Sequence, residues 1–364
     1  MKKFIFCLAF ILTTIYSSCY AHKPYNELEI KTVNLEVFPK KSSVYAAGTE
    51  VTIGDLHGNA IKLLYFLINS HVLNLSKGSY KLLLEIYKKK PEQLTAEDLT
   101  LFRDLVDQGT YSAEQKIRFL GDDLCDRGMN DYFTLLIYKK LDSEDVPFEI
   151  VLSNHGNFFL EAYESLDHDF SKNPYGQGKN ESIVQSMLNL AKIINRGLVN
   201  KEEVIQIVQT HYLKHIVFPG YLINKNKKEI TIFSHAPLDL QILNALAQDL
   251  QVKYSDRNLD DLSQSFNAIN TVMTQWIMSN NFTKHYTELN EAHTKSNTES
   301  PIHQVLWNRD YAILDRNYEP ENKPYFVNYV HGHDSEPNVF DLDNLLGKGI
   351  KHNKGPYAVH LTHE

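Results

Sequence analysis

Short runs of β-branched, aliphatic and aromatic residues recur along the chain, and each is followed at once by a small polar loop. The five clearest runs occupy residues 51–53, 117–120, 148–152, 230–233 and 325–330. Runs of this length and composition predict buried β-strands. Each following loop carries an acid, an amide or a histidine, so the strand ends are the first place to look for chemistry.

Apolar residues recur at helical spacing after two of these loops. They stand at positions 61, 64, 65 and 68, and again at 135, 136 and 141 after Asn130, which is suited to cap a helix. Strands alternating with helices predict an α/β fold, in which the loops after the strands share one edge of the sheet. We therefore expect the polar loop residues to lie together.

Two long stretches between these landmarks, about 73–115 and 240–300, look like helical insertions, and 183–215 also has a helical pattern. No internal repeat and no long Gly/Ser- or Pro-rich linker divides the chain. The sequence thus predicts a single domain over residues 22–364 that carries these insertions.

The first 21 residues have the pattern of a cleaved export signal. Lys2 and Lys3 precede an apolar run at 4–16, and small or polar residues follow up to Ala21. The run is too short for a permanent transmembrane helix, and an uncleaved anchor is the alternative interpretation. We expect an exported protein, periplasmic or secreted, with delivery to a host as an effector as a further option, and no stable membrane insertion after cleavage.

Composition and charge exclude some classes of function. The formal charge is −8, from 37 basic and 45 acidic residues, which argues against a general nucleic-acid binder. Three cysteines are present, and removal of the signal would leave only Cys125, so an internal disulfide is excluded. Sixteen histidines are the unusual feature of the composition.

The loops after the five runs combine carboxylates, an amide and histidines, a donor set suited to Mn, Fe or Zn. Asp55 and His57, two positions apart, can point to the same ion, and an acid from a neighbouring strand end can bridge to a second one. Two such cations activate water for in-line attack on phosphorus. The alternative is a set of buried histidines and solvated acids without a ligand.

Six motifs in order resemble those of the phosphoprotein phosphatases of the calcineurin-like metallophosphoesterase superfamily, in particular the bacterial and phage members. They are GDLHG at 54–58, the run from Asp122 to Gly128 ending in DRG, NH at 154–155, SH at 234–235, VLWNR at 305–309 and GH at 332–333. The resemblance covers roughly residues 51–349. It implies an α/β metallophosphoesterase-like fold with two β-sheets flanked by helices.

The resemblance also implies two divalent metal ions, with Mn favoured and Zn or Fe as options, and a bridging hydroxide as the nucleophile. One ion would take Asp55, His57 and Asp122, and the other would take Asp122, Asn154, His235 and His333. His155 would be the general acid, oriented by Asp126. Arg127 and Arg309 would bind the phosphate oxygens.

The chain departs from the family pattern at two places. Three residues separate Asp122 from Asp126 where the family commonly has two, so either Asp122 or Asp123 bridges the metals. Asp122 is favoured because it follows Gly121 directly, as Asp55 follows Gly54. The third motif has Ser153 and Gly156 where the family usually has a glycine and an acid, respectively.

The sequence therefore predicts a two-metal phosphomonoesterase that acts on phosphoproteins or phosphopeptides and not on nucleic acid. One alternative is a nucleotide phosphohydrolase of the diadenosine-tetraphosphate type. Another is a metal-stabilised binding module that has lost turnover through the changes at Cys125 and Gly156. Retention of Asp126 and His155 argues against that second alternative.

Overall fold

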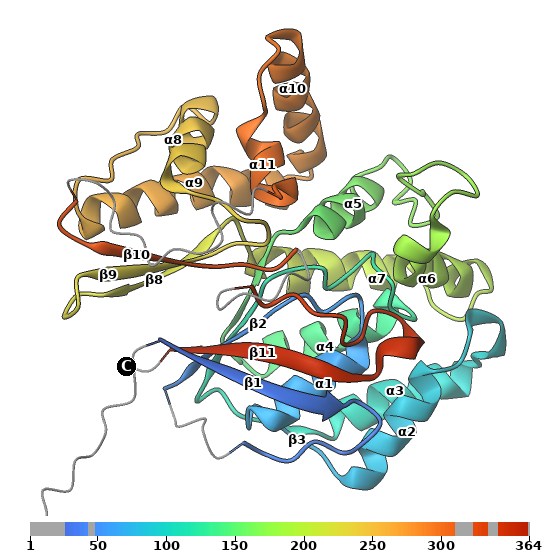
Figure 1. The fold of residues 1–364 in the computed structure, drawn as a ribbon. Coiled ribbons are helices and arrows are strands. Elements are labelled where there is room, and N and C mark those ends of the chain that lie inside the picture. The colour runs from blue at the N-terminus through green and yellow to red at the C-terminus, as the bar shows by residue number, and fades with distance from the viewer. Residues whose placement is uncertain (1–25, 43–47, 310–322, 334–340, 363–364) are drawn as a thin grey trace, which may run out of the picture.

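The structure is a computed structural model that describes residues 26–42, 48–309, 323–333 and 341–362 (Figure 1). The expected export signal, residues 1–21, lies outside these ranges. Within them, no helix is both long enough and apolar enough to cross a lipid bilayer.

Two β-sheets form the centre of the fold (Figure 1). The larger has the strand order β1 (Asn26–Asn34), β11 (Lys354–Thr362), β2 (Glu50–Ile53), β5 (Lys116–Phe119), β6 (Phe148–Val151) and β7 (Ile216–Val217). The smaller has the order β10 (Phe326–Val330), β9 (Glu229–Phe233) and β8 (Gly220–Asn224). Helices flank both sheets, so the expected α/β class with two sheets and flanking helices is confirmed.

All five expected strands are present, as β2, β5, β6, β9 and β10. β2, β5, β6 and β7 run parallel, and β9 and β10 are parallel to each other. The sequence analysis did not identify β1, β8 or β11. β1 and β11 pair antiparallel with each other over nine residues each, and β11 also pairs with β2. The paired residues of β1 and β11 are about 330 positions apart, so their pairing cannot be predicted from a local sequence pattern.

The polar loops lead directly into capped helices. Asn59 caps α1 (Ala60–Asn69), Asn130 caps α4 (Asp131–Ser143) as expected, and Ser153 caps α5 (Asn154–Tyr163). In each case the side-chain oxygen accepts hydrogen bonds from backbone N–H groups of the first helical turn that would otherwise lack partners. These caps fix the ends of the loops that carry the candidate site.

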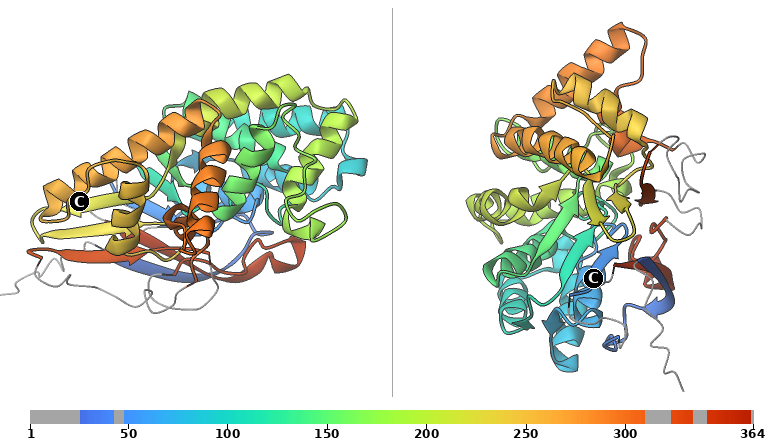
Figure 2. Two further views of the ribbon diagram at one scale, coloured as in Figure 1. Left: turned by 90° about the horizontal axis from the view of Figure 1, so that it is seen from above. Right: turned by 90° about the vertical axis from the view of Figure 1, so that its left-hand side faces the viewer.

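The two stretches expected to be helical insertions consist largely of helices. The first contains α2 (Lys77–Tyr87) and α3 (Ala96–Asp107), but it is closed by a short antiparallel pair, β3 (Leu73–Asn74) and β4 (Thr110–Tyr111), which corrects the all-helical expectation. The second contains α8 (Leu240–Asp249), α9 (Leu259–Met278) and α10 (Phe282–Lys295), followed by α11 (Pro301–Trp307). Of these helices, α8 and α9 lie over the smaller sheet, whereas α10 projects away from it (Figure 1; a second view is given in Figure 2). The stretch 183–215 contains α6 (Gln185–Asn195) and α7 (Lys201–Ile207).

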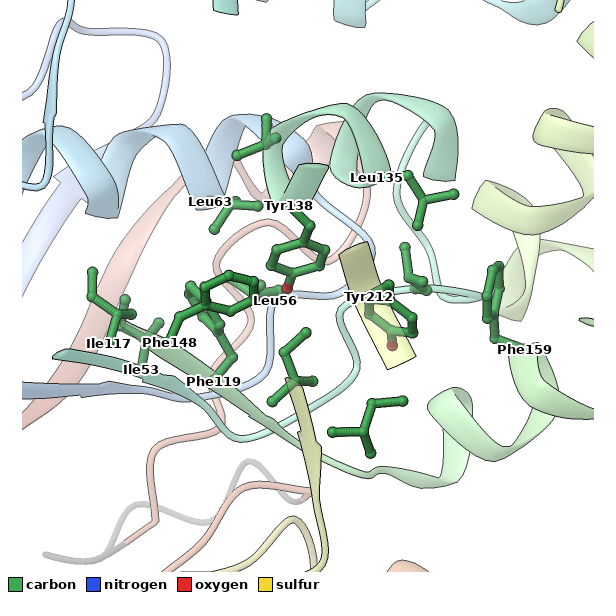
Figure 3. Close-up of a cluster of buried hydrophobic side chains, with 14 of the residues drawn as sticks. Ile53, Leu56, Leu63, Ile117, Phe119, Leu135, Tyr138, Phe148, Phe159 and Tyr212 are labelled. Carbon is green, nitrogen blue, oxygen red and sulfur yellow. The ribbon is translucent and has the colours of Figure 1, made fainter. Parts of the chain in front are cut away.

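The alternation of side chains along β5 divides the core in two. Ile117 and Phe119 lie on the helical side, where the Phe119 ring is 5.8 Å from the ring of Tyr138 in α4 (Figure 3). Arg118 lies on the opposite face, with its guanidinium 3.7 Å from the ring centroid of Phe233 in the smaller sheet. Successive residues of a strand point to opposite faces, so β5 contacts both layers. The two sheets are thereby held together close to their strand ends.

Candidate active site

The carboxyl ends of β2, β5, β6, β9 and β10 place their loops around one centre. Asp55, Asp122 and His235 come from three of these loops, and each offers a ligand atom within 4.8 Å of the others. All three side chains are buried. The structure thus brings together residues separated by up to 180 positions in the sequence.

His235 is the centre of a second group that contains Asn154 and His333. Its Nδ1 donates to the carbonyl of Leu120 at 2.8 Å, which leaves the lone pair on Nε2. That Nε2 lies 2.8 Å from Asn154 Oδ1, 3.0 Å from His333 Nδ1 and 3.5 Å from Asp122 Oδ1. The four residues assigned by resemblance to one metal therefore converge on one point.

His57 lies on the other side of Asp122, against acids from two loops. Its Nδ1 is 3.0 Å from Asp126 Oδ2, and its Nε2 is 2.7 Å from the carbonyl of Asn344 and 3.3 Å from Asp343 Oδ1. Burial acts to lower the pKa of His57, but the hydrogen bonds to Asp126 and Asp343 raise it above its usual value. Asp55, His57 and Asp343 also have ligand atoms within 4.8 Å of one another.

Asp343 was missed by the sequence analysis. It lies in the sequence Asp341-Leu342-Asp343, downstream of β10, and its carboxyl is almost completely buried. Burial opposes ionisation, yet the contacts with His57 and the charges of Lys348 and Lys62 lower the pKa of Asp343 to about 2. The signal in the sequence that could have identified Asp343 is the pair of acids, Asp341 and Asp343, between β10 and β11.

The two adjacent acids of the second motif have different surroundings. Asp122 faces the cluster beside His235, whereas the carboxyl of Asp123 lies near the phenols of Tyr138 and Tyr212, which are both drawn in Figure 3. Burial raises the pKa of Asp123 to about 7. The geometry therefore places Asp122, rather than Asp123, at the centre of the candidate site.

Three of the expected ligands have an unusual backbone conformation. The φ angles of His57, Asp122 and His333 are 56°, 48° and 76°, in the left-handed region that non-glycine residues seldom adopt. Residues held in such conformations cluster at functional sites. The backbone next to His333 is also tightly packed, because a Cβ atom on the preceding Gly332 would lie 2.0 Å from Asp55 Oδ1.

Asp126 connects the expected general acid to the rest of the cluster. Its Oδ1 is 3.7 Å from His155 Nε2 and accepts a hydrogen bond from Arg127 at 2.6 Å. His155 Nδ1 donates to the carbonyl of Cys125 at 2.6 Å, so this carbonyl, in addition to Asp126, orients the imidazole. Burial would raise the pKa of Asp126, but the charges of His155 and His57 lower it well below its usual range.

Arg309 approaches the site from the end of α11. Asn308, which precedes it, donates to the carbonyl of Pro237 at 2.9 Å, and the Trp307 ring is 6.1 Å from the His333 ring. Burial, the charge of His235 and the charge of Arg309 together lower the pKa of His333 to about 3. Arg309 therefore lies near the His333 side of the cluster, and its side chain is exposed.

The charges of the cluster fit divalent cations. Burial and the proximity of Asp343 and Asp122 raise the pKa of Asp55 well above its usual value. Asp122 Oδ1 is buried and has no hydrogen-bond partner among the residues described, and it lies 3.5 Å from His235 Nε2. Bound cations would relieve the repulsion between the acids and supply a partner for this oxygen.

Comparison with known proteins identifies the class of protein as a phosphatase. A family described as "WipA-like, phosphatase domain" matches residues 116–348, and the chain belongs to that family. The fold is similar to the crystal structure of the phosphatase domain from the Legionella effector WipB, with a TM-score of 0.66 and 26% sequence identity. This match covers 78% of the chain and 99% of the WipB domain. Curated proteins gave no significant match.

Proposed function

We propose that the chain is a two-metal phosphomonoesterase of the calcineurin-like superfamily that acts on phosphoproteins. The observation that carries this proposal is the convergence of Asp55, Asp122 and His235, with the buried Oδ1 of Asp122 left without a hydrogen-bond partner among the described residues. Membership of a phosphatase family supports the reaction class.

The donor set divides into two groups that share Asp122. One ion would be held by Asp55, His57, Asp122 and the additional carboxylate of Asp343, and the other by Asp122, Asn154, His235 and His333. The mixture of oxygen and nitrogen donors suits Mn, with Zn or Fe as alternatives. Such ions would supply an activated water and positive charge for the phosphoryl group.

The remaining residues would donate a proton to the leaving oxygen and bind the phosphate. The carbonyl of Cys125 holds His155 Nδ1, so His155 Nε2 is the nitrogen available to give a proton to the leaving oxygen. Ionised Asp126 would stabilise the protonated imidazole. Arg127, held by Asp126, and Arg309 would bind the non-bridging phosphate oxygens.

The proposal includes export of the protein and its delivery to a host. The single catalytic domain would span residues 22–364, with residues 1–21 removed on export. The similarity to a Legionella effector supports delivery to a host and a phosphoprotein substrate there. N-terminal sequencing of the exported chain should give a start near His22; a start at Met1 would contradict cleavage.

The test is a hydrolysis assay on the full mature chain. Metal-stripped protein is given Mn, Zn, Fe or Mg and assayed with phosphoserine, phosphothreonine and phosphotyrosine peptides and with diadenosine tetraphosphate. We expect metal-dependent release of phosphate from at least one peptide. Preferential cleavage of the nucleotide would favour a nucleotide phosphohydrolase, and no turnover with any metal would favour a binding module.

A further inference from the structure

A pocket of about 610 Å³ lies between α10 and α11, next to the candidate active site. Both Glu299, just before α11, and Arg309, just after it, line the pocket. The seven residues of α11 rise about 10 Å between these two ends. Glu299 and Arg309 each lie two positions beyond an end of this helix, so the pocket extends along the whole of α11, from the expected phosphate-binding arginine to a carboxylate beyond its other end.

A continuous set of rings connects this pocket to the expected general acid. The His155 ring is 5.9 Å from Phe158, and Phe158 is 5.5 Å from Trp307. Trp307 in turn stacks on His303 at 5.8 Å, and the His303 Nδ1 is 2.9 Å from the Tyr286 hydroxyl. Trp307, His303 and Tyr286 all line the pocket. A chain bound at the active site could continue along this aromatic wall.

The pocket is tied to the helix that carries His155. Glu164, at the end of α5, accepts hydrogen bonds from the backbone N–H groups of Phe282 and Thr283 at 3.1 and 2.7 Å, which caps the start of α10. At the other end of α10, His293 is 2.9 Å from Asp249 and 2.8 Å from Thr298. Helix α5, which carries His155, is therefore joined directly to α10, which lines the pocket.

The lining of the pocket suits a cationic donor. Asn290 Oδ1 is a buried acceptor and Ser300 Oγ a buried hydroxyl, and neither has a hydrogen-bond partner among the described residues. The carboxylate of Glu299 is exposed beside them. Aromatic faces attract cations, and the rings of Tyr286 and Trp307 both line the pocket. These groups together match an ammonium or guanidinium group.

We propose that this pocket binds a basic side chain of the phosphoprotein substrate, about three to five residues from the phosphorylated residue. An extended chain advances about 3.3 Å per residue, so three residues span α11 itself, and further residues are needed because Glu299 lies beyond the end of the helix. The acidic net charge of −8 favours a basic partner segment. This inference rests on the proposed phosphatase function, which supplies the phosphorylated end of the same chain.

Steady-state kinetics on the metal-loaded full chain test the pocket. The probes are phosphopeptides with Lys, Ala or Glu three, four or five residues before or after the phosphorylated residue, with p-nitrophenyl phosphate as a substrate that lacks a peptide. We expect kcat/KM for a Lys peptide to exceed that of the Ala peptide about fivefold to tenfold, mainly through KM, as one cation–π or charge-assisted contact would give.

Glu299→Gln and Asn290→Leu should abolish this preference and leave p-nitrophenyl phosphate hydrolysis unchanged. Glu291→Gln is the matched control, because Glu291 lies on α10 outside this pocket and its side chain is 63% exposed. Equal rates for the Lys, Ala and Glu peptides would overturn the inference. An equal loss of the preference in the Glu291→Gln control would also overturn it.

The two proposals can fail separately. If p-nitrophenyl phosphate is hydrolysed but the Lys preference is absent, the pocket assignment fails and the phosphatase stands. If no substrate is hydrolysed, the proposed function fails. Peptide binding measured by fluorescence polarisation then still decides the pocket: Lys-selective binding lost in Glu299→Gln supports it, and non-selective binding overturns it.

Discussion

At the scale of single residues, the central distinction is between Asp122 and Asp123. Asp122 lies 3.5 Å from His235, whereas Asp123 is buried near two tyrosine phenols. We predict that Asp122→Asn lowers metal content and reduces activity at least about 100-fold, because a bridging carboxylate binds both cations and screens their mutual repulsion. Asp123→Asn should retain its metal. Elemental analysis of both purified variants is the measurement, and depletion only in Asp123→Asn would move the bridge by one residue.

Asp343 gives a second prediction at this scale. Asp343→Asn should weaken Mn²⁺ binding about 10- to 100-fold, because Asp343 is placed to share an ion with Asp55 and His57. Asp341→Asn is the matched control: Asp341 lies two positions away, accepts from the Asp343 N–H at 2.9 Å, and is outside the donor groups.

Calorimetric titration of Mn²⁺ into the metal-stripped variants measures this effect directly. Equal Mn²⁺ affinity in the wild-type chain and Asp343→Asn would remove Asp343 from the metal site. An equal loss in Asp341→Asn would show that the whole loop, and not one carboxylate, is responsible.

At the scale of elements, the loops of the candidate site are interlocked through their glycines. A Cβ on Gly128 would lie 1.7 Å from the carbonyl oxygen of Gly58, so the first and second loops touch backbone to backbone. We predict that Gly128→Ala destabilises the chain by about 1–3 kcal/mol and reduces activity, since the loops must separate. Thermal melting and kinetics of the variant measure both effects.

Gly355→Ala is the control for this prediction, because a Cβ there would meet no atom within 4 Å. Its melting temperature should stay close to that of the wild-type chain. A stable and fully active Gly128→Ala variant would show that the close approach of the two loops is not needed for the site.

The strands and loops that form the candidate site could be predicted because their signals are local. A buried run followed by Asp55 or Asp122 is visible in the sequence, and so is the cap at Asn130. By contrast, β1 and β11 pair across almost the whole chain. The approach of Asp343 to His57 likewise arises from tertiary folding, since 286 positions separate the two residues.

At the scale of the whole molecule, stability should depend on metal and not on oxidation. Cys125 is a free, buried thiol, and burial raises its pKa well above the usual value, so it is unreactive. Cations bound only by the native cluster stabilise the fold by about 3 kcal/mol at a hundredfold excess over Kd. We predict that chelator lowers the melting temperature and reductant does not. A melt that responds to reductant alone would contradict this picture.

The central claim is that the strand-end cluster holds two divalent ions, and anomalous diffraction from crystals of the Mn²⁺-loaded chain tests it most directly. We expect two anomalous peaks from bound Mn²⁺. One should be bounded by Asp55, His57, Asp122 and Asp343, and the other by Asp122, Asn154, His235 and His333. A fully Mn²⁺-equilibrated crystal of active protein with no peak among these side chains would contradict the claim.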